Sequence, residues 1–321
     1  MNALRRQGWL LTTVLLMVSA CTPAPEPRLR VGTIPWPGYE PLFLGRELGL
    51  FPSQRVHLVE YVSSAQVVRA FRNGAIDAMT ASLEEVLLFE QLGHEPQVVL
   101  VLDGSNGADC VMARPEVDGL AGLEGRRIGS EDSTLGLYML SRVLEKSGLK
   151  REDVRLDIQP LETHVEAYQR GALDAVVTFE PYCRRLADVG ARRLFDSSNI
   201  PGEIVDVLIV RKQFIEAHPE QVDALLRGWF ATLAWARKHP QESASRMARR
   251  LGMDAQRFSE ALSGIHLMDE RDQHAQLTGA PPRLQESIER LGDMLRRHEL
   301  LSERPSATRI LNASPLLRVA P

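Results

Sequence analysis

The 321-residue sequence is poor in cysteine and in aromatic residues, and it has no excess of positive charge. It contains 3 cysteines, aromatic residues make up 6% of it, and its formal net charge is −4. This balance excludes the strongly basic surface of a typical nucleic-acid-binding domain, so we expect no nucleic-acid partner. The sequence also lacks the G-x-S-x-G, H-E-x-x-H and P-loop motifs, and its 8 histidines are scattered. These absences argue against the common hydrolase, zinc-protease and nucleotide-binding classes.

A short apolar run stands near the N-terminus, just after Arg5 and Arg6. Residues 8–18 read GWLLTTVLLMV, which is short for a membrane span and typical of a signal peptide. The following VSAC resembles the lipobox of bacterial lipoproteins, with Cys21 as the lipidated residue. We therefore predict a lipoprotein signal peptide over residues 1–20, a Pro-rich tether over residues 21–28, and a lipid-anchored body at the periplasmic face of a bacterial membrane. A plain secretory signal is the alternative.

The other two cysteines, Cys110 and Cys183, lie in the body of the chain. Their spacing gives no metal-binding pattern, so we expect no metal site. An exported protein could pair them in a disulfide, but we expect two buried thiols.

One phrase occurs twice in the chain. AFRNGAIDA begins at Ala70 and AYQRGALDA begins at Ala167, so the two copies are 97 residues apart. The same shift carries VGT at Val31 onto IGS at Ile128. We therefore predict that the two segments share one architecture.

Each copy has the order strand, helix, strand, helix, strand, which predicts an α/β fold with two lobes. The Asp of each phrase, Asp77 or Asp174, is expected to bind backbone amides at its turn. The long C-terminal helices are expected to pack on lobe one. The predicted lobe one therefore comprises residues 29–105 and 211–321, and the predicted lobe two comprises residues 106–210. Two chain crossings of this kind leave a cleft that can close by hinge motion.

Several motifs together resemble a known family. They are GYEPLFLGRELGLF, the AFRNGAIDA phrase, TFEPY at Thr178, and HPEQVDALLRGWFATLAWARKHP. In their order and spacing they are similar to the periplasmic substrate-binding proteins of ABC importers for nitrate, sulfonates, taurine and thiamine-pyrimidine precursors. The resemblance implies a bilobed type II periplasmic binding protein with a small-molecule ligand in the cleft. It also implies a permease and an ATPase as partners, a monomer, and no cofactor or catalytic residue.

Candidate ligand-binding residues lie in loops at strand ends, where open α/β lobes bind ligands. Two aromatic residues of the first loop could form an apolar or cation–π wall, or could simply cap the core. The resemblance implies contacts from the turn that starts SSAQ, although a serine there could only cap its helix. Hydroxyl groups after AIDAM could also bind ligand, or only tie down their own turn. The candidates in lobe one are Trp36, Tyr39, Ser64, Gln66, Thr80 and Ser82.

The second half of the chain offers a different set of side chains. Ser133 and Thr134 precede an apolar helical run, and free N–H groups at a helix start favour an anion. The neighbouring Glu131 and Asp132 weaken that interpretation, because carboxylates repel an anion. The carboxylates Asp109, Glu180 and Asp206 favour instead a ligand with a cationic or amine-bearing part. A sulfonate, a taurine-like zwitterion and an aminopyrimidine are the candidate solutes.

Three other functions share the expected fold. A sensor would report its ligand to a membrane receptor, and nothing in the sequence separates this function from transport. An enzyme similar to the thiamine-pyrimidine synthases is less favoured, because their cysteine-rich motif is absent. The effector domain of a transcription factor does not fit an export signal.

Overall fold

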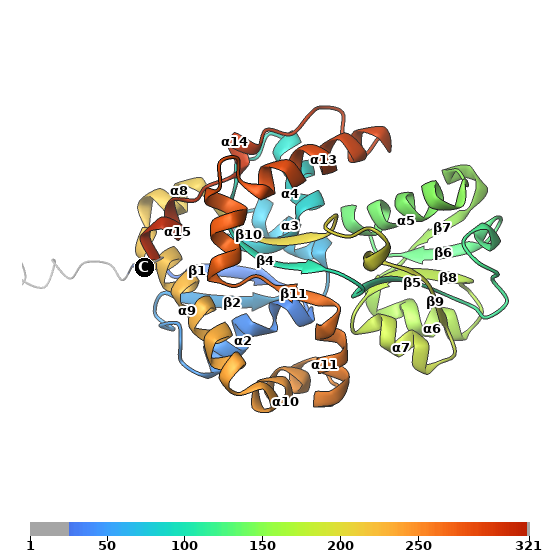
Figure 1. Ribbon diagram of the computed structural model, residues 1–321, viewed down its shortest axis with the longest axis horizontal. Helices are drawn as coiled ribbons and strands as arrows, with labels where there is room; N and C mark the ends of the chain where they lie inside the picture. Colours follow the sequence, from blue (N-terminus) through green and yellow to red (C-terminus); the bar gives the residue numbers. More distant parts are fainter. Residues whose placement is uncertain (1–25, 320–321) are drawn as a thin grey trace, which may run out of the picture.

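The computed structural model describes residues 26–319, which form two α/β lobes side by side, each built around one sheet (Figure 1). The predicted signal peptide, the lipidation site Cys21 and most of the predicted tether lie outside the described residues. No helix within residues 26–319 combines the length and the apolar character needed to cross a membrane.

Lobe one contains a six-stranded sheet with the order β11-β4-β10-β3-β1-β2. Strand β1 pairs in parallel with β2 and β3, whereas β10 and β4 run antiparallel to their neighbours. The strands are β1 (Leu29–Thr33), β2 (Val56–Glu60), β3 (Ala78–Ser82), β4 (Pro96–Ser105), β10 (Val205–Arg211) and β11 (Ile265–Leu267).

Lobe two contains a five-stranded sheet with the order β7-β6-β8-β5-β9. Strand β6 pairs in parallel with β7 and β8, and β5 runs antiparallel to β8 and β9. The strands are β5 (Asp109–Ala113), β6 (Arg127–Ser130), β7 (Arg155–Ile158), β8 (Ala175–Phe179) and β9 (Arg192–Asp196).

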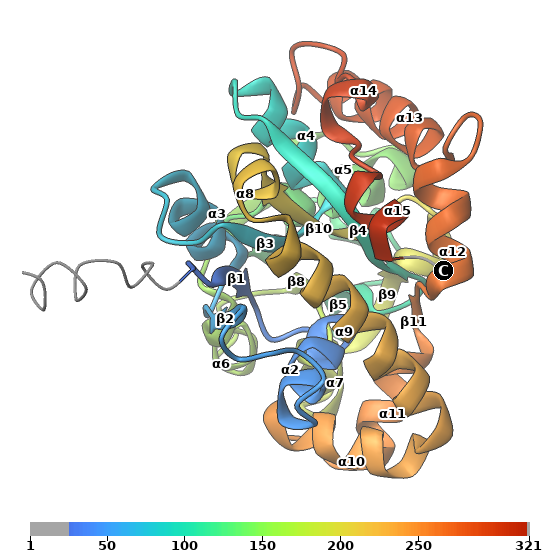
Figure 2. The ribbon, with the colours of Figure 1, turned by 90° about the vertical axis from the view of Figure 1, so that its left-hand side faces the viewer.

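Helices cover both sheets, and the C-terminal helices pack on lobe one as the sequence predicts (Figure 2). Helix α9 packs against α2 and β2, while α13 packs against α4. Lobe two has α5 (Thr134–Ser147), α6 (His164–Gln169) and α7 (Tyr182–Asp188). Lobe one has α2 (Glu40–Glu47), α3 (Ser64–Arg72), α4 (Leu83–Gln91), α8 (Lys212–Ala217), α9 (Pro219–Lys238), α10 (Pro240–Arg250), α11 (Ala255–Ser263), α12 (Glu270–Gln273), α13 (Arg283–Arg297), α14 (Ala307–Ile310) and α15 (Ser314–Val319).

The repeated phrase corresponds to one structural unit in each lobe, so the prediction of shared architecture is confirmed. Strand β1 pairs with β3 at Val31 and Ala78, and β6 pairs with β8 at Ile128 and Ala175, both shifted by 97 residues. In each copy a glycine with positive φ, 73° at Gly74 and 76° at Gly171, ends the helix before the second strand of that pair. Glycine is favoured there because a Cβ would be strained.

The aspartate of each phrase binds a backbone amide, as the sequence predicted, but this amide belongs to the neighbouring strand and not to the turn. Asp77 accepts a hydrogen bond from the backbone N–H of Arg30 at 3.1 Å and pairs with its guanidinium. Asp174 does the same with the backbone N–H and guanidinium of Arg127. The arginine partners are also 97 residues apart, and the sequence analysis did not identify them.

The chain passes between the lobes twice, once from β4 to β5 and once from β9 to β10. Ser105 and Ser197 join the two crossings through a 2.8 Å contact between their hydroxyl groups. The predicted boundary at residue 210 differs from the observed sheet membership, because β10 lies between β3 and β4 in the first sheet. Lobe two therefore ends before Val205. The apolar run of β10 gave no sign of which sheet it enters.

The expectation of two free thiols is wrong, because Cys110 and Cys183 form a disulfide. Cys110 lies on β5, which pairs with β8, and Cys183 lies on the helix that follows β8. Their Cα atoms are 6.3 Å apart. Their separation of 73 positions in the sequence concealed this proximity.

Candidate ligand-binding site

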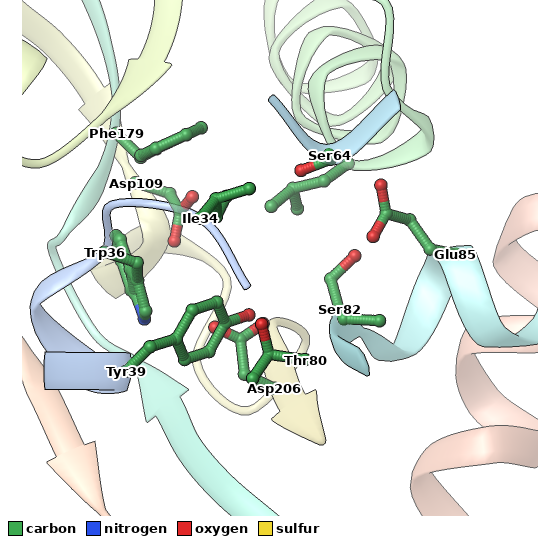
Figure 3. Close-up of a pocket in the computed structure, with 12 residues that line it drawn as sticks. Ile34, Trp36, Tyr39, Ser64, Thr80, Ser82, Glu85, Asp109, Phe179 and Asp206 are labelled. Carbon is green, nitrogen blue, oxygen red and sulfur yellow. The ribbon is translucent and has the colours of Figure 1, made fainter. Parts of the chain in front are cut away.

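A cavity with an empty volume of about 390 Å³, part of it open to solvent, lies between the two lobes (Figure 3). Strand ends and helix starts of lobe one and three residues of lobe two build its wall. The lining residues are Ile34, Trp36, Tyr39, Ser64, Thr80, Ala81, Ser82, Glu85, Asp109, Leu135, Phe179 and Asp206.

Trp36 and Tyr39 form the aromatic wall of the cavity. Both lie in the Pro-rich loop after β1 and are buried, each with 4% of its surface exposed. The indole N–H of Trp36 donates to an Asp103 carboxylate oxygen at 3.2 Å, which fixes the ring plane. Phe179 from lobe two meets the indole edge to face, with ring centroids 5.7 Å apart. The aromatic wall therefore spans the gap between the lobes.

Three polar residues form a row across the first sheet beneath this wall. Asp206 on β10 is in register with Ser82 on β3 and with Asp103 on β4. Ser82 and Asp206 line the cavity, and Asp103 lies behind the wall in contact with Trp36. Thr80, two residues earlier on β3, donates its hydroxyl hydrogen to Thr33 at 3.1 Å.

Two helix starts of lobe one close the cavity opposite Trp36. Ser64 is the first residue of α3, and Glu85 lies in the first turn of α4 (Figure 3). Helix α4 follows directly after the last residue of β3, and this connection brings Glu85 close to Ser82.

Lobe two contributes one acid and two apolar side chains. Asp109 is the first residue of β5, and Phe179 is the last residue of β8. The two residues are paired in register across these strands. Leu135 comes from the first turn of α5. Cys110 follows Asp109 directly in the sequence, so its disulfide with Cys183 supports this side of the cavity.

The distribution of ion pairs separates the buried acids into two groups. Ten acidic side chains within residues 26–319 are buried. Four of them pair with arginine, namely Glu40, Asp77, Glu180 and Asp223. The other six have no ion-pair partner in that range; they are Glu84, Glu85, Asp103, Asp109, Glu131 and Asp206. Glu85, Asp109 and Asp206 line the cavity, Asp103 contacts Trp36 behind the wall, and Glu84 and Glu131 interact electrostatically with lining acids.

Burial and mutual repulsion favour the protonated form of these unpaired acids. Burial raises the pKa of Glu84, Glu85 and Asp103 to about 8, and the pKa of Asp109 and Glu131 to about 7. Burial and the neighbouring Asp103 raise the pKa of Asp206 well above its ordinary value.

Seven of the eleven candidate residues lie on the cavity wall. They are Trp36, Tyr39, Ser64, Thr80, Ser82, Asp109 and Asp206. The four others have different positions. Ser133 caps α5 by accepting a hydrogen bond from the N–H of Gly136 at 3.0 Å, and Thr134 is the first residue of that helix. Gln66 lies in the first turn of α3, away from the wall.

Glu180 also lies off the wall. It is buried, accepts a hydrogen bond from the N–H of Arg184 at 3.2 Å, and pairs with Arg193 at 3.4 Å. The sequence predicted this acid as a ligand contact, but the backbone N–H of Arg184 and the guanidinium of Arg193 already occupy its carboxylate.

Several residues on the cavity wall or directly behind it were not predicted from the sequence. Asp103 had a clear signal, because a lone charge inside the apolar run VVLVLDG marks a buried acid. Glu85 stands three residues after Ser82, in the S-x-x-E spacing of a capping box, which suggests a structural role instead. Ile34, Ala81, Leu135 and Phe179 are apolar and had no distinguishing signal.

The model of the NMT1-like family matches residues 22–252. The chain belongs to this family. One similar protein is the taurine-binding periplasmic protein of Escherichia coli (strain K12), which is 25% identical over 231 residues. The match covers 68% of this chain and 71% of that protein. The alkanesulfonate-binding protein SsuA from Xanthomonas axonopodis pv. citri, solved with MOPS bound, has a TM-score of 0.73 at 17% identity, covering 90% of this chain and 99% of that chain. This NMT1-like chain therefore has the bilobed periplasmic-binding-protein fold.

An enzyme also shares this fold. The desulfurization enzyme DSZB has a TM-score of 0.66 at 18% identity, covering 91% of this chain and 99% of that chain. The fold of an NMT1-like protein therefore does not decide between binding and catalysis. Within the described residues, the cavity wall contains no cysteine, histidine or lysine.

Proposed function

We propose that this protein is the solute-binding component of an ABC importer and that it binds a small organic solute through a protonated amine. The single observation that carries the proposal is the set of six unpaired, buried acids around a cavity between two lobes. A buried carboxylate is stable as an ion only when a cation or hydrogen bonds compensate its lost hydration.

The similar proteins support the solute-binding part of this proposal. The names of two of them describe binding of taurine and of alkanesulfonates. Taurine carries an ammonium group, which the carboxylates could hold, and an aminopyrimidine could do so when protonated. A sulfonate without an amine fits less well, because the wall within the described residues has three carboxylates and no arginine or lysine.

Closure of the lobes would complete the site. In the closed arrangement, Asp109, Leu135 and Phe179 of lobe two face the wall of lobe one across the cavity. This enclosure would remove water from the solute and strengthen its electrostatic contacts. The permease of the importer would receive the solute, and its ATPase would drive transport. A lipid on Cys21 would anchor the protein at the periplasmic face of the membrane, where it would act as a monomer. A sensor would use the same closure, with a signalling receptor in place of the permease.

A thermal-shift and calorimetry panel tests this function. We expect taurine and small primary amines to raise the midpoint of unfolding, and propane-1-sulfonate to leave it unchanged. At 100 times its Kd, a ligand stabilises the folded state by about 2.7 kcal/mol. Tighter binding of amine-free sulfonates than of amines would overturn the proposal.

A further inference from the structure

The unpaired acids approach the cavity from both lobes and from opposite sides. Asp206 and Glu85 belong to lobe one, and Asp109 belongs to lobe two. In Figure 3, Glu85 lies across the cavity from Trp36 and Asp109. The cavity therefore has two acidic ends, one beside the aromatic wall and one at the start of α4.

Two buried polar atoms on the cavity wall have no hydrogen-bond partner within residues 26–319. They are Oδ2 of Asp109 and Oγ of Ser82. The two side chains are almost fully buried, with 3% and 4% of the residue surface exposed. Buried polar atoms are nearly always hydrogen-bonded in folded proteins, so these two indicate contacts with a ligand.

Apolar side chains also line the cavity, and Figure 3 places Ile34 between Asp109 and Glu85. Ile34 and Leu135 contribute aliphatic side chains, and Trp36 and Phe179 contribute ring faces and edges. A ligand that reached both acidic ends would therefore have an apolar segment between its polar groups.

We propose that the solute is a dication, with two protonated amines joined by a short aliphatic chain. This inference rests on the proposed function, because it specifies the solute of the same cavity. One ammonium group would bind at Asp206 and Asp109 beside the aromatic wall. The second would bind at Glu85, with Ser64 and Ser82 as hydroxyl partners.

The charges of the two lobes explain why two positive charges fit better than one. Asp109 of lobe two raises the pKa of Glu84 of lobe one, and Glu131 of lobe two raises the pKa of Glu85 of lobe one, in both cases in addition to the larger effect of burial. Two arginines of lobe two are already paired with other acids, since the guanidinium of Arg193 pairs with Glu180 and that of Arg184 pairs with Glu260. Closure therefore brings together acids that repel one another when they are ionised, so each stays protonated unless a cation binds beside it. A monocation would stabilise the ionised form at one end and leave the acid at the other end protonated and without an ionic partner.

Calorimetric titration of the purified protein with matched amines tests the inference. The probes are the series from ethane-1,2-diamine to hexane-1,6-diamine, n-butylamine, n-pentylamine and taurine. We expect the best diamine to bind at least tenfold more tightly than the monoamine of the same chain length, with an optimum length within the series. Binding of n-butylamine or taurine within threefold of the best diamine would overturn the dication while leaving the proposed function intact. Failure of every amine would overturn both.

Variants locate the two ends. Glu85→Gln and Asp206→Asn should each reduce the ratio of diamine affinity to monoamine affinity to below about threefold, because each removes one anionic end. Asp132→Asn is the matched control, since Asp132 is exposed and adjoins Glu131. It should preserve the ratio. Thermal unfolding of each ligand-free variant establishes that it folds, and the wild-type ligand series gives a result that depends on no variant. Loss of the ratio in Asp132→Asn, or its retention in Glu85→Gln, would contradict the assignment of the ends.

Discussion

At the scale of single residues, Gly38 shows how little space the aromatic wall leaves. A Cβ atom at this position would lie 2.1 Å from an Asp103 carboxylate oxygen and 2.5 Å from the indole nitrogen of Trp36. Both atoms belong to the hydrogen bond that orients the tryptophan ring. The absence of a side chain is therefore a requirement of the cavity wall.

We expect Gly38→Ala to weaken solute binding by at least about tenfold, because the new methyl group would displace Asp103 from Trp36. Gly104→Ala is the control. Gly104 adjoins Asp103, but a Cβ there would have its nearest neighbour at an ordinary 3.5 Å. Calorimetry would measure both affinities. Equal affinities in the two variants would show that the Trp36–Asp103 contact does not shape the site.

Some of the wall residues could be predicted from the sequence and others could not. Trp36 and Tyr39 stood out because aromatic residues are scarce and these two lie in a Pro-rich loop after a strand. Leu135 and Phe179 could not be distinguished from ordinary core residues. Glu180 was misjudged, because the sequence does not show that Arg193, 13 residues later, would reach it.

At the scale of elements, the disulfide ties β5 to α7 in lobe two. The strand starts with Asp109, and the helix follows the strand that ends with Phe179. The cross-link therefore holds together both segments that lobe two contributes to the cavity.

We expect Cys110→Ala combined with Cys183→Ala to lower the free energy of unfolding by about 2–4 kcal/mol, the typical contribution of a disulfide. Urea unfolding would measure the loss. Thiol titration before and after reduction is the accompanying test. A chain that gains no thiols on reduction would show that these two cysteines are unpaired.

The repeat made the order of elements predictable in both lobes, because the same strand–helix phrases occur 97 residues apart. The position of β10 was not predictable in the same way. An apolar strand that joins the middle of a sheet has the same pattern whichever sheet it enters. Only its pairing with β3 and β4 assigns it to lobe one.

At the scale of the whole molecule, contacts between α7 and α11 connect the rims of the two lobes. Asp188 pairs with Arg257 at 2.9 Å, and Arg184 pairs with Glu260. On the other side of the cleft, Glu145 of α5 lies 3.4 Å from His298, which directly follows α13. These contacts favour closed lobes.

We expect Asp188→Asn combined with Arg184→Gln to weaken solute binding by about two- to thirtyfold, because the double variant removes two exposed ion pairs that contribute about 0.2–1 kcal/mol each. The faster step should be solute release, measured by stopped-flow fluorescence. Arg237→Gln is the control, since its partner Asp269 belongs to the same lobe. A release rate that matches the control would show that the rim pairs do not favour closure.

The unpaired acids also predict how stability depends on pH. In the ligand-free protein, burial raises the pKa of Glu84 and Glu85 to about 8, whereas glutamate in an unfolded chain titrates near pH 4.3. Between pH 6.5 and 8 the folded state therefore holds more protons than the unfolded state, and stability falls as pH rises. Below pH 6.5, the buried His164, whose pKa is lowered to about 4, makes a contribution of opposite sign, because its own effect on stability becomes more favourable as pH rises.

We expect the midpoint of thermal unfolding to fall between pH 6.5 and pH 8 in the ligand-free protein. Glu84→Gln, which removes an acid behind the cavity wall, should raise the midpoint at pH 8 by at least about 2 °C and make the decline shallower. Differential scanning calorimetry would measure both. A midpoint that rises over this range in the wild-type protein would contradict the assignment of these protons.

Asp206 is the second residue of the strand that follows the return crossing between the lobes. The residue that would bind a solute therefore also lies next to the hinge segment between the two lobes. A ligand that binds its carboxylate would therefore act directly on the segment that connects the lobes. A partner that recognises only the angle between the two lobes would in this way respond to the charge of the bound solute.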